Sequence, residues 1–158
     1  MEHFAKLLNI VDTNESSQKF RHMKDDIVGF LLQNLEKLCL LEKEYHSNIL
    51  RPIPNSYFAE YKQRYKEILE PVCVKHFLKK RCYAGSVSSM ARYDYLSRNC
   101  YKIKFIMKSA KKSTVEIYCN NSLNEKDQFT LNEIDGCWKI SGIKHGYGDE
   151  DKWSQCPI

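Results

Sequence analysis

Apolar residues recur every three to four positions in the first half of the chain and at every second position in the second half. Between residues 17 and 46 this spacing predicts a long amphipathic helix. The preceding segment, residues 14–17 (NESS), offers several possible N-cap side chains. The apolar stripe of this helix consists of Phe20, Met23, Ile27, Phe30, Leu31, Leu35, Leu38, Leu41 and Tyr45.

Shorter helical patterns flank this segment. Residues 4–11 predict a short leading helix, and a second helix is predicted from Pro54, because proline is tolerated at the first helical position. Pro71 ends or kinks that helix, and Val72, Val74, Phe77 and Leu78 predict a third piece. Residues 83–99 are expected to form a loop with one short strand.

From Cys100 onward the pattern predicts four strands with one apolar and one polar face, and hence an antiparallel sheet covered on one side. The Asp135-Gly136 pair predicts a tight turn between the last two strands. Helices followed by a meander indicate an α+β fold. We expect a single domain over 1–158, with a helical part at about 4–81, a sheet part at about 83–147 and a tail at 148–158. The inward stripe is Ile103, Phe105, Met107, Val115, Ile117, Phe129, Leu131, Trp138 and Ile140.

Charge and composition bear on whether the protein binds nucleic acid or associates with a membrane. The formal net charge is +5, but the lysines are scattered rather than gathered in a stripe. Tyrosines near basic residues, such as Tyr65 beside Arg64 and Tyr93 beside Arg92, leave a weak nucleic-acid-binding module as an alternative. Apolar runs are too short to span a bilayer and no segment resembles a signal peptide, so we expect a cytoplasmic protein without membrane association.

The seven cysteines are odd in number and irregular in spacing, which predicts reduced thiols rather than a disulfide framework. Cys73, His76 and Cys82 are the nearest approach to a metal motif. A structural zinc site needs a fourth ligand at regular spacing, so we predict buried thiols and neither a metal nor a cofactor.

A set of short motifs in a fixed order carries a family resemblance. They are Phe77-Leu-Lys-Lys-Arg-Cys-Tyr-Ala-Gly85, Tyr93-Asp94, Thr114-Val-Glu116, Phe129-Thr-Leu131, Gly136-Cys-Trp-Lys-Ile-Ser-Gly-Ile-Lys144 and Trp153. Over residues 54–153 the chain resembles the immunity proteins of bacterial polymorphic toxin systems that have a nuclear transport factor two-like fold. The resemblance implies a curved antiparallel sheet that forms a cone around the N-terminal helices. It also implies binding of a cognate toxin domain.

Proteins with this cone also include isomerases and dehydratases, which need an acid or base on the inner face of the sheet. No carboxylate or histidine interrupts the predicted inward stripe, and only Asp94 and His145 are expected near the mouth of a cone. We therefore predict no catalytic residues. A small-molecule-binding protein or an isomerase-like or dehydratase-like enzyme of the same fold remains the alternative.

The expected function is steric neutralisation of a toxin C-terminal domain by a monomer or homodimer. Trp153 is expected either to cap the sheet or to anchor a partner, and the acidic run 149–151 to be a solvated turn or a patch that faces a basic partner. The candidate contacts, taken from the loops and the tail, are His145, Tyr147, Asp149, Glu150 and Trp153, followed by Lys79, Lys80 and Arg81 at a helix end.

Overall fold

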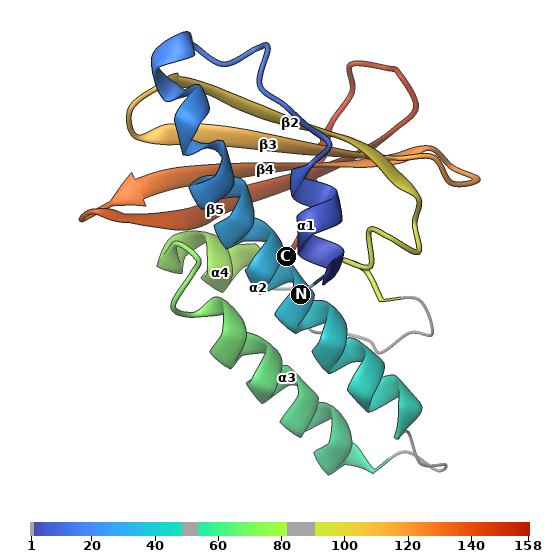
Figure 1. Ribbon diagram of the computed structural model, residues 1–158. Helices are drawn as coiled ribbons and strands as arrows, with labels where there is room; N and C mark the ends of the chain where they lie inside the picture. Colours follow the sequence, from blue (N-terminus) through green and yellow to red (C-terminus); the bar gives the residue numbers. More distant parts are fainter. Residues whose placement is uncertain (1, 49–53, 82–90) are drawn as a thin grey trace.

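The computed structural model describes residues 2–48, 54–81 and 91–158, with the side chains of residues 5–48, 54–80 and 91–158. Within these ranges the elements are α1 (Glu2–Leu8), β1 (Val11–Asp12), the 3-10 helix η1 (Gln18–Met23), α2 (Lys24–Ser47), α3 (Asn55–Leu69), α4 (Lys75–Arg81), β2 (Cys100–Ser109), β3 (Lys112–Cys119), β4 (Glu125–Ile134), β5 (Cys137–Tyr147) and β6 (Ser154–Gln155). The α-helices lie on one side of the sheet, and α2 and α3 extend together beyond it (Figure 1).

The sheet has six strands in the order in which they occur in the sequence, β1 to β6. Strands β2 to β5 form the predicted antiparallel meander. The sheet as a whole is mixed, because β1 runs parallel to β2, with Val11 opposite Ile103. The expectation of a purely antiparallel sheet was therefore wrong at one edge. The chain reaches that edge from α1, which the sequence pattern did not place beside a strand.

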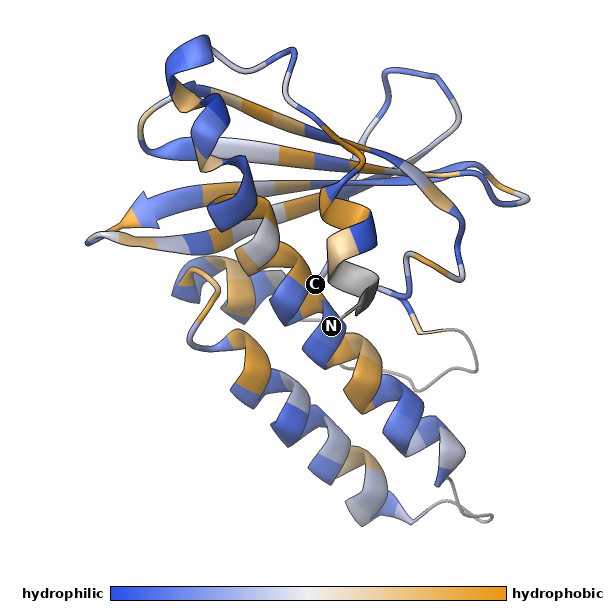
Figure 2. Ribbon diagram, in the orientation of Figure 1, coloured by the Kyte–Doolittle hydropathy of each residue, from blue (hydrophilic) through white to orange (hydrophobic). Residues whose placement is uncertain are grey.

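The core lies between α2 and the helix-facing side of the sheet. Eight of the nine residues of the predicted inward stripe are fully buried, from Ile103 to Ile140, which confirms the period-two interpretation of these strands. Trp138 is half-buried and packs against the rim of this core. Apolar positions alternate with polar ones along the strands (Figure 2). Because the apolar residues point to the helices, the polar residues between them lie on the other face of the sheet.

Residues 17–46 do not form one continuous helix. A 3-10 helix precedes α2, and its N-cap residue, Ser17, makes no side-chain capping bond. Its neighbour Ser16 is buried and bonds to the sheet instead. The Ser16 hydroxyl donates to the Phe105 carbonyl at 2.7 Å and accepts from the Met107 amide at 2.8 Å. These bonds hold the chain against β2 just before η1.

The turn between β4 and β5 confirms the predicted Asp-Gly hairpin. Asp135 and Gly136 have φ angles of +52° and +82°, and the flanking residues Ile134 and Cys137 are paired. Two consecutive residues with positive φ match the right-handed twist of the strands that they join. This turn fixes the register at the start of β5.

Two further expectations concern the segments on either side of the meander. The described part of the predicted loop, residues 91–99, consists of turns without a strand, and residues 83–90 lie outside the described residues. The tail joins the fold: β6 pairs with β5, and Ile158 is fully buried in the core. Among the helices of the described residues, no stretch has the length and apolar character that crossing a bilayer requires.

We expect Ser16→Ala to lower the free energy of unfolding by about 1–3 kcal/mol, because it leaves the buried Met107 amide and Phe105 carbonyl without their side-chain partner. Urea unfolding followed by circular dichroism measures the change. The control is Ser47→Ala, at an exposed position at the end of α2, which should change stability by less than about 0.5 kcal/mol. Equal effects of the two substitutions would contradict the anchoring role of Ser16.

Candidate functional site

A register shift in β5 determines which side chains meet at one end of the sheet. Leu131 pairs with Ile140, whereas the next residue of β4, Thr130, pairs with Gly142, so that Ser141 is an extra residue in β5. A bulge of this kind changes the face to which the following residues point. It places His145 opposite Asp127 on the helix-facing side of the sheet.

Asp127 is almost completely buried, with 1% of its surface exposed. The Tyr95 hydroxyl donates to its Oδ2 at 2.7 Å, and His145 Nδ1 lies 2.6 Å from its Oδ1. Arg98 Nη1 lies 3.4 Å from Oδ2. Burial alone raises the pKa of Asp127, but the hydrogen bond with His145, the charge of Arg98 and the bond from Tyr95 outweigh it and hold this pKa below its usual value. The Asp127 carboxylate is therefore negatively charged, and its hydrogen bonds and the nearby guanidinium offset the cost of burying that charge.

Arg98 connects two carboxylates with the segment before β2. Its Nη2 atom lies 3.3 Å from Glu125 Oε2, and its Nη1 atom donates to the Arg92 carbonyl at 2.6 Å. His145 Nε2 lies 3.6 Å from Glu125 Oε1, so that the imidazole lies between the carboxylates of Glu125 and Asp127. Asn121 donates to Glu125 Oε2 at 2.6 Å. The result is one continuous polar network over residues 92–145.

A cavity of about 330 Å³ opens beside this network, and we call it the Asp127 cavity. In this cavity an imidazole is oriented by a buried carboxylate, next to guanidinium groups and a thiol. Such an arrangement can bind a small polar molecule and can accept or donate a proton. The lining residues are Ala91, Arg92, Arg98, Glu125, Asp127, His145 and Cys156.

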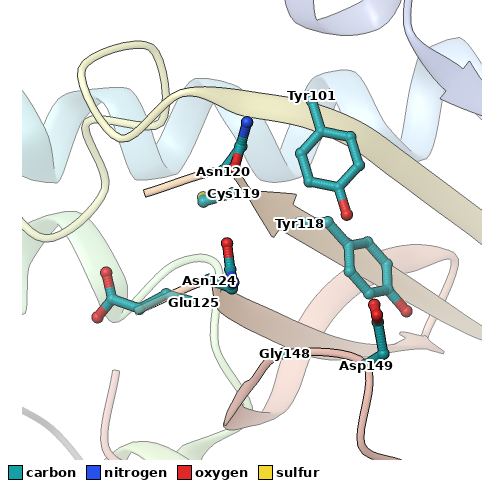
Figure 3. Close-up of a pocket in the computed structure, with 8 residues that line it drawn as sticks. All are labelled: Tyr101, Tyr118, Cys119, Asn120, Asn124, Glu125, Gly148 and Asp149. Carbon is teal, nitrogen blue, oxygen red and sulfur yellow. The ribbon is translucent and has the colours of Figure 1, made fainter. Parts of the chain in front are cut away.

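A second hollow of about 330 Å³ lies at the same end of the sheet and shares Glu125 with the Asp127 cavity. We call it the sheet-end hollow. Figure 3 shows Tyr101 and Tyr118 on one side of it, the asparagines at its centre and Asp149 below Tyr118. The Gly148 amide donates to the Asn124 carbonyl at 2.8 Å and holds the loop after β5 in place. The lining residues are Tyr101, Tyr118, Cys119, Asn120, Asn124, Glu125, Gly148 and Asp149.

The residues predicted from the end of β5 come together only in part. His145 lines the Asp127 cavity, and its ring meets the ring of Tyr147 edge-on with centroids 4.9 Å apart. Asp149 lines the sheet-end hollow. Glu150 forms an ion pair with Lys152, and its carbonyl accepts a bond from Lys126.

Trp153 packs on the sheet, as the capping alternative expects, and its half-exposed side chain leaves the role of partner anchor a prediction. Its ring packs edge-on against Tyr118 at 6.5 Å, and the Lys126 ammonium lies 4.4 Å from its ring centroid. In β4, Lys126 alternates with the inward residues Glu125 and Asp127, so that Trp153 covers the outer face of the sheet.

The cationic residues of α4 are separate from both hollows. Lys79 and Lys80 are exposed, and the described linings of the Asp127 cavity and the sheet-end hollow include neither of them. Arg81 ends α4, and its side chain lies outside the described residues.

The statement that no carboxylate or histidine interrupts the inward stripe was wrong. Glu125 and Asp127 continue the stripe of Phe129 and Leu131 toward the start of β4, and their period-two spacing in the sequence was a signal that could have found them. Arg98 and Tyr95 carried no such signal, because they come from turns. Asp94, the other candidate, instead forms an ion pair with Lys43 at 2.7 Å and accepts bonds from Ser97.

The metal motif is not assembled in the part that the structure describes. Cys73 is buried, whereas His76 is exposed, and Cys82 lies outside the described residues. No group of three or more His, Cys, Asp or Glu side chains among the described residues is arranged to hold a metal ion. The six described cysteines form no disulfide with one another.

Comparison with known proteins adds no assignment: no protein-family model matches the chain, and neither the curated proteins nor the solved structures contain a match.

We expect Asp127→Asn to lower the free energy of unfolding at pH 7 by about 3–5 kcal/mol, because the buried Arg98 guanidinium loses a charged partner. The folded-state pKa of Asp127 lies below the ordinary carboxyl value of about 3.9. The stability contributed by this carboxylate is therefore complete above that value and is lost as the pH falls through the folded-state pKa.

The measurement is urea unfolding at a series of pH values from about 7 down to about 2. The loss of stability with acid should be smaller in Asp127→Asn than in the unaltered protein. Asp151→Asn, at an exposed position, is the control and should leave the pH dependence unchanged. An identical acid dependence in both variants would contradict the role assigned to Asp127.

Proposed function

We propose that this chain is an immunity protein of a bacterial polymorphic toxin system, with a nuclear transport factor two-like cone, which neutralises its cognate toxin domain by binding it in the cytoplasm. The mechanism is steric occlusion of the toxin without turnover. One observation carries the proposal: an exposed aromatic side chain lines the sheet-end hollow, and two further exposed apolar residues directly precede residues of its lining.

Exposed apolar side chains that lie together on a surface often mark a protein–protein interface. Among the described residues, Tyr101, Leu123 and Tyr147 are 54%, 61% and 55% exposed. Tyr101 lines the sheet-end hollow, and Leu123 and Tyr147 directly precede the lining residues Asn124 and Gly148. Aromatic residues around a concave surface are the usual anchors of protein–protein binding. This end of the sheet is therefore the expected toxin-binding surface.

Charged residues surround these anchors. Asp149 and Asp151 are exposed in the loop after β5, and Lys102 lies over the ring of Tyr118 at 4.4 Å. Charges of both signs at the rim favour a specific partner with a complementary pattern and speed its capture. The acidic run thus fits a patch that faces basic side chains of the toxin.

The architecture supports the family part of the proposal. Helices that precede a meander and cover one face of it agree with the order of elements that the resemblance implies. The described motif segments fall on successive strands: Thr114–Glu116 on β3, Phe129–Leu131 on β4 and Trp138–Lys144 on β5. A fold of this class carries many functions, so the binding surface has to be tested directly.

The test is co-expression with the C-terminal domain encoded by the neighbouring upstream reading frame, in a sensitive host. The domain should kill alone and be neutralised in the presence of this protein, and a stoichiometric complex should be recovered. A harmless domain, or killing that is equal with and without this protein, would overturn the proposal.

Tyr147→Ala should weaken the complex by about 2 kcal/mol, or about 30-fold in Kd, because it removes an exposed aromatic ring next to the sheet-end hollow. Isothermal titration calorimetry with the purified toxin domain measures the change. Ile134→Ala is the matched control: Ile134 is also apolar and exposed, at 41%, but it lies at the opposite end of β4. It should leave the affinity unchanged, and an equal loss in both variants would contradict the assigned surface.

A second candidate function is an acid–base enzyme of the isomerase or dehydratase type. The pair of His145 and Asp127, 2.6 Å apart and facing the Asp127 cavity, favours it. The two functions make different predictions for His145→Gln. An enzyme turns over a cavity ligand and loses this turnover in the variant, whereas a toxin-binding protein shows no turnover before or after the substitution.

A further inference from the structure

A third cavity, of about 190 Å³, lies on the helical side of the molecule, where α1 lies beside α2 (Figure 1). Its described wall comes from α1, from α2 and from the turns at residues 93–97. We call it the α1–α2 cavity. Its described lining shares no residue with the Asp127 cavity or with the sheet-end hollow, so it is a separate site.

Apolar side chains from three segments line the α1–α2 cavity: Leu7 from α1, Leu32, Leu35 and Leu40 from α2, and Leu96 from the turns. Leu7, Leu32 and Leu35 are buried, whereas Leu40 is 58% exposed and therefore lies at the opening. An apolar cavity of about 150 Å³ is large enough to bind benzene. The α1–α2 cavity thus has the size for one aromatic ring with a small substituent.

An ion pair fixed by a turn interrupts this apolar wall. Lys43 Nζ lies 2.7 Å from Asp94 Oδ2, and both residues line the cavity, as does Ser97. The Ser97 amide donates to Asp94 Oδ1 at 3.2 Å, and its hydroxyl donates to Oδ2 at 2.8 Å. Burial raises the pKa of Asp94, but the bonds from Lys43 and Ser97 outweigh it and hold this pKa below its usual value. A few fixed polar groups in an apolar wall are typical of small-molecule sites.

The charges of the wall favour a neutral ligand. Glu36 also lines the cavity, so that two carboxylates accompany the single ammonium of Lys43. The excess of negative charge disfavours an anion, and the ammonium beside Asp94 repels a cation. An ammonium has three N–H donors, so Lys43 can donate to a ligand as well as to Asp94. A hydroxyl group matches this pair, because it can accept from the ammonium and donate to the carboxylate.

Two tyrosines add an aromatic part to the wall. Tyr93 and Tyr95 line the α1–α2 cavity, and their ring centroids are 6.2 Å apart. Aromatic side chains pack favourably against a further ring. The Tyr93 hydroxyl is buried and has no hydrogen-bond partner among the described residues. Such a hydroxyl is costly, and a molecule bound against this residue can supply a partner.

We propose that the α1–α2 cavity binds a small neutral molecule of the phenol class, one aromatic ring that carries a hydroxyl group. The ring packs against the leucines, and the hydroxyl group lies at the ion pair of Lys43 and Asp94. This binding goes beyond toxin neutralisation and does not depend on it, because the cavity is separate from the sheet-end hollow.

The test uses the folded full-length chain, with 4-fluorophenol and fluorobenzene as probes in a titration followed by fluorine NMR. 4-Fluorophenol should bind saturably, with a Kd of roughly 0.1–1 mM. Fluorobenzene fills nearly the same space without a hydroxyl group. It should bind about tenfold more weakly, because the ion pair then loses water without gaining a hydrogen bond.

Lys43→Met tests the polar part of the site, because it removes the ammonium and keeps an unbranched apolar side chain. The preference for 4-fluorophenol over fluorobenzene should fall to about twofold or less. Lys37→Met is the matched control. Lys37 is exposed on the same helix and is not part of the described lining, so this variant should keep the preference.

Leu40→Gln tests the location of the site. It removes apolar surface at the opening and should weaken the binding of both probes by about threefold to tenfold. Leu123→Gln, at an apolar position that is 61% exposed near the sheet-end hollow, is the matched control and should leave both affinities unchanged. Circular dichroism verifies that each variant is folded.

Three results would overturn the proposal. The first is the absence of saturable 4-fluorophenol binding up to about 10 mM. The second is a preference for 4-fluorophenol in Lys43→Met that equals that of the unaltered protein. The third is an equal effect of Leu40→Gln and Leu123→Gln on the affinity for 4-fluorophenol.

Discussion

The burial of Asp127 is the constraint on which one whole end of the molecule depends. A charged carboxylate that is 1% exposed needs partners on several sides, and these come from different parts of the chain. Tyr95 and Arg98 approach from the turns before β2, and His145 approaches from β5. Because such a network is costly when incomplete, it fixes how residues 91–99 lie against the sheet.

The same network shapes both hollows. Glu125 follows Asp127 on the inward face of β4 and borders the Asp127 cavity on one side and the sheet-end hollow on the other. The exposed ring of Tyr101 lines the sheet-end hollow, whereas Arg92 and His145 line the Asp127 cavity. The two hollows are thus neighbours that share one carboxylate of the polar network.

Much of the fold could be predicted because its signals are local. The spacing of apolar residues identified the long helix and the strands, and the Asp135-Gly136 pair identified the hairpin. Most of the candidate site could not be predicted in this way. Arg98 meets Asp127 across 29 positions in sequence, and Arg92 meets Cys156 across 64. No periodicity encodes such pairings, because they depend on how turns approach the sheet.

The sequence by itself determined the α+β class, the order of the helices and the meander, and which strand residues form the core. These features follow from side-chain periodicity, which a single segment expresses without its neighbours. Only the tertiary structure decided the face of His145 and the burial of Asp127. The extra residue Ser141 in β5 reverses the side to which the following residues point, and this reversal exists only relative to the register with β4.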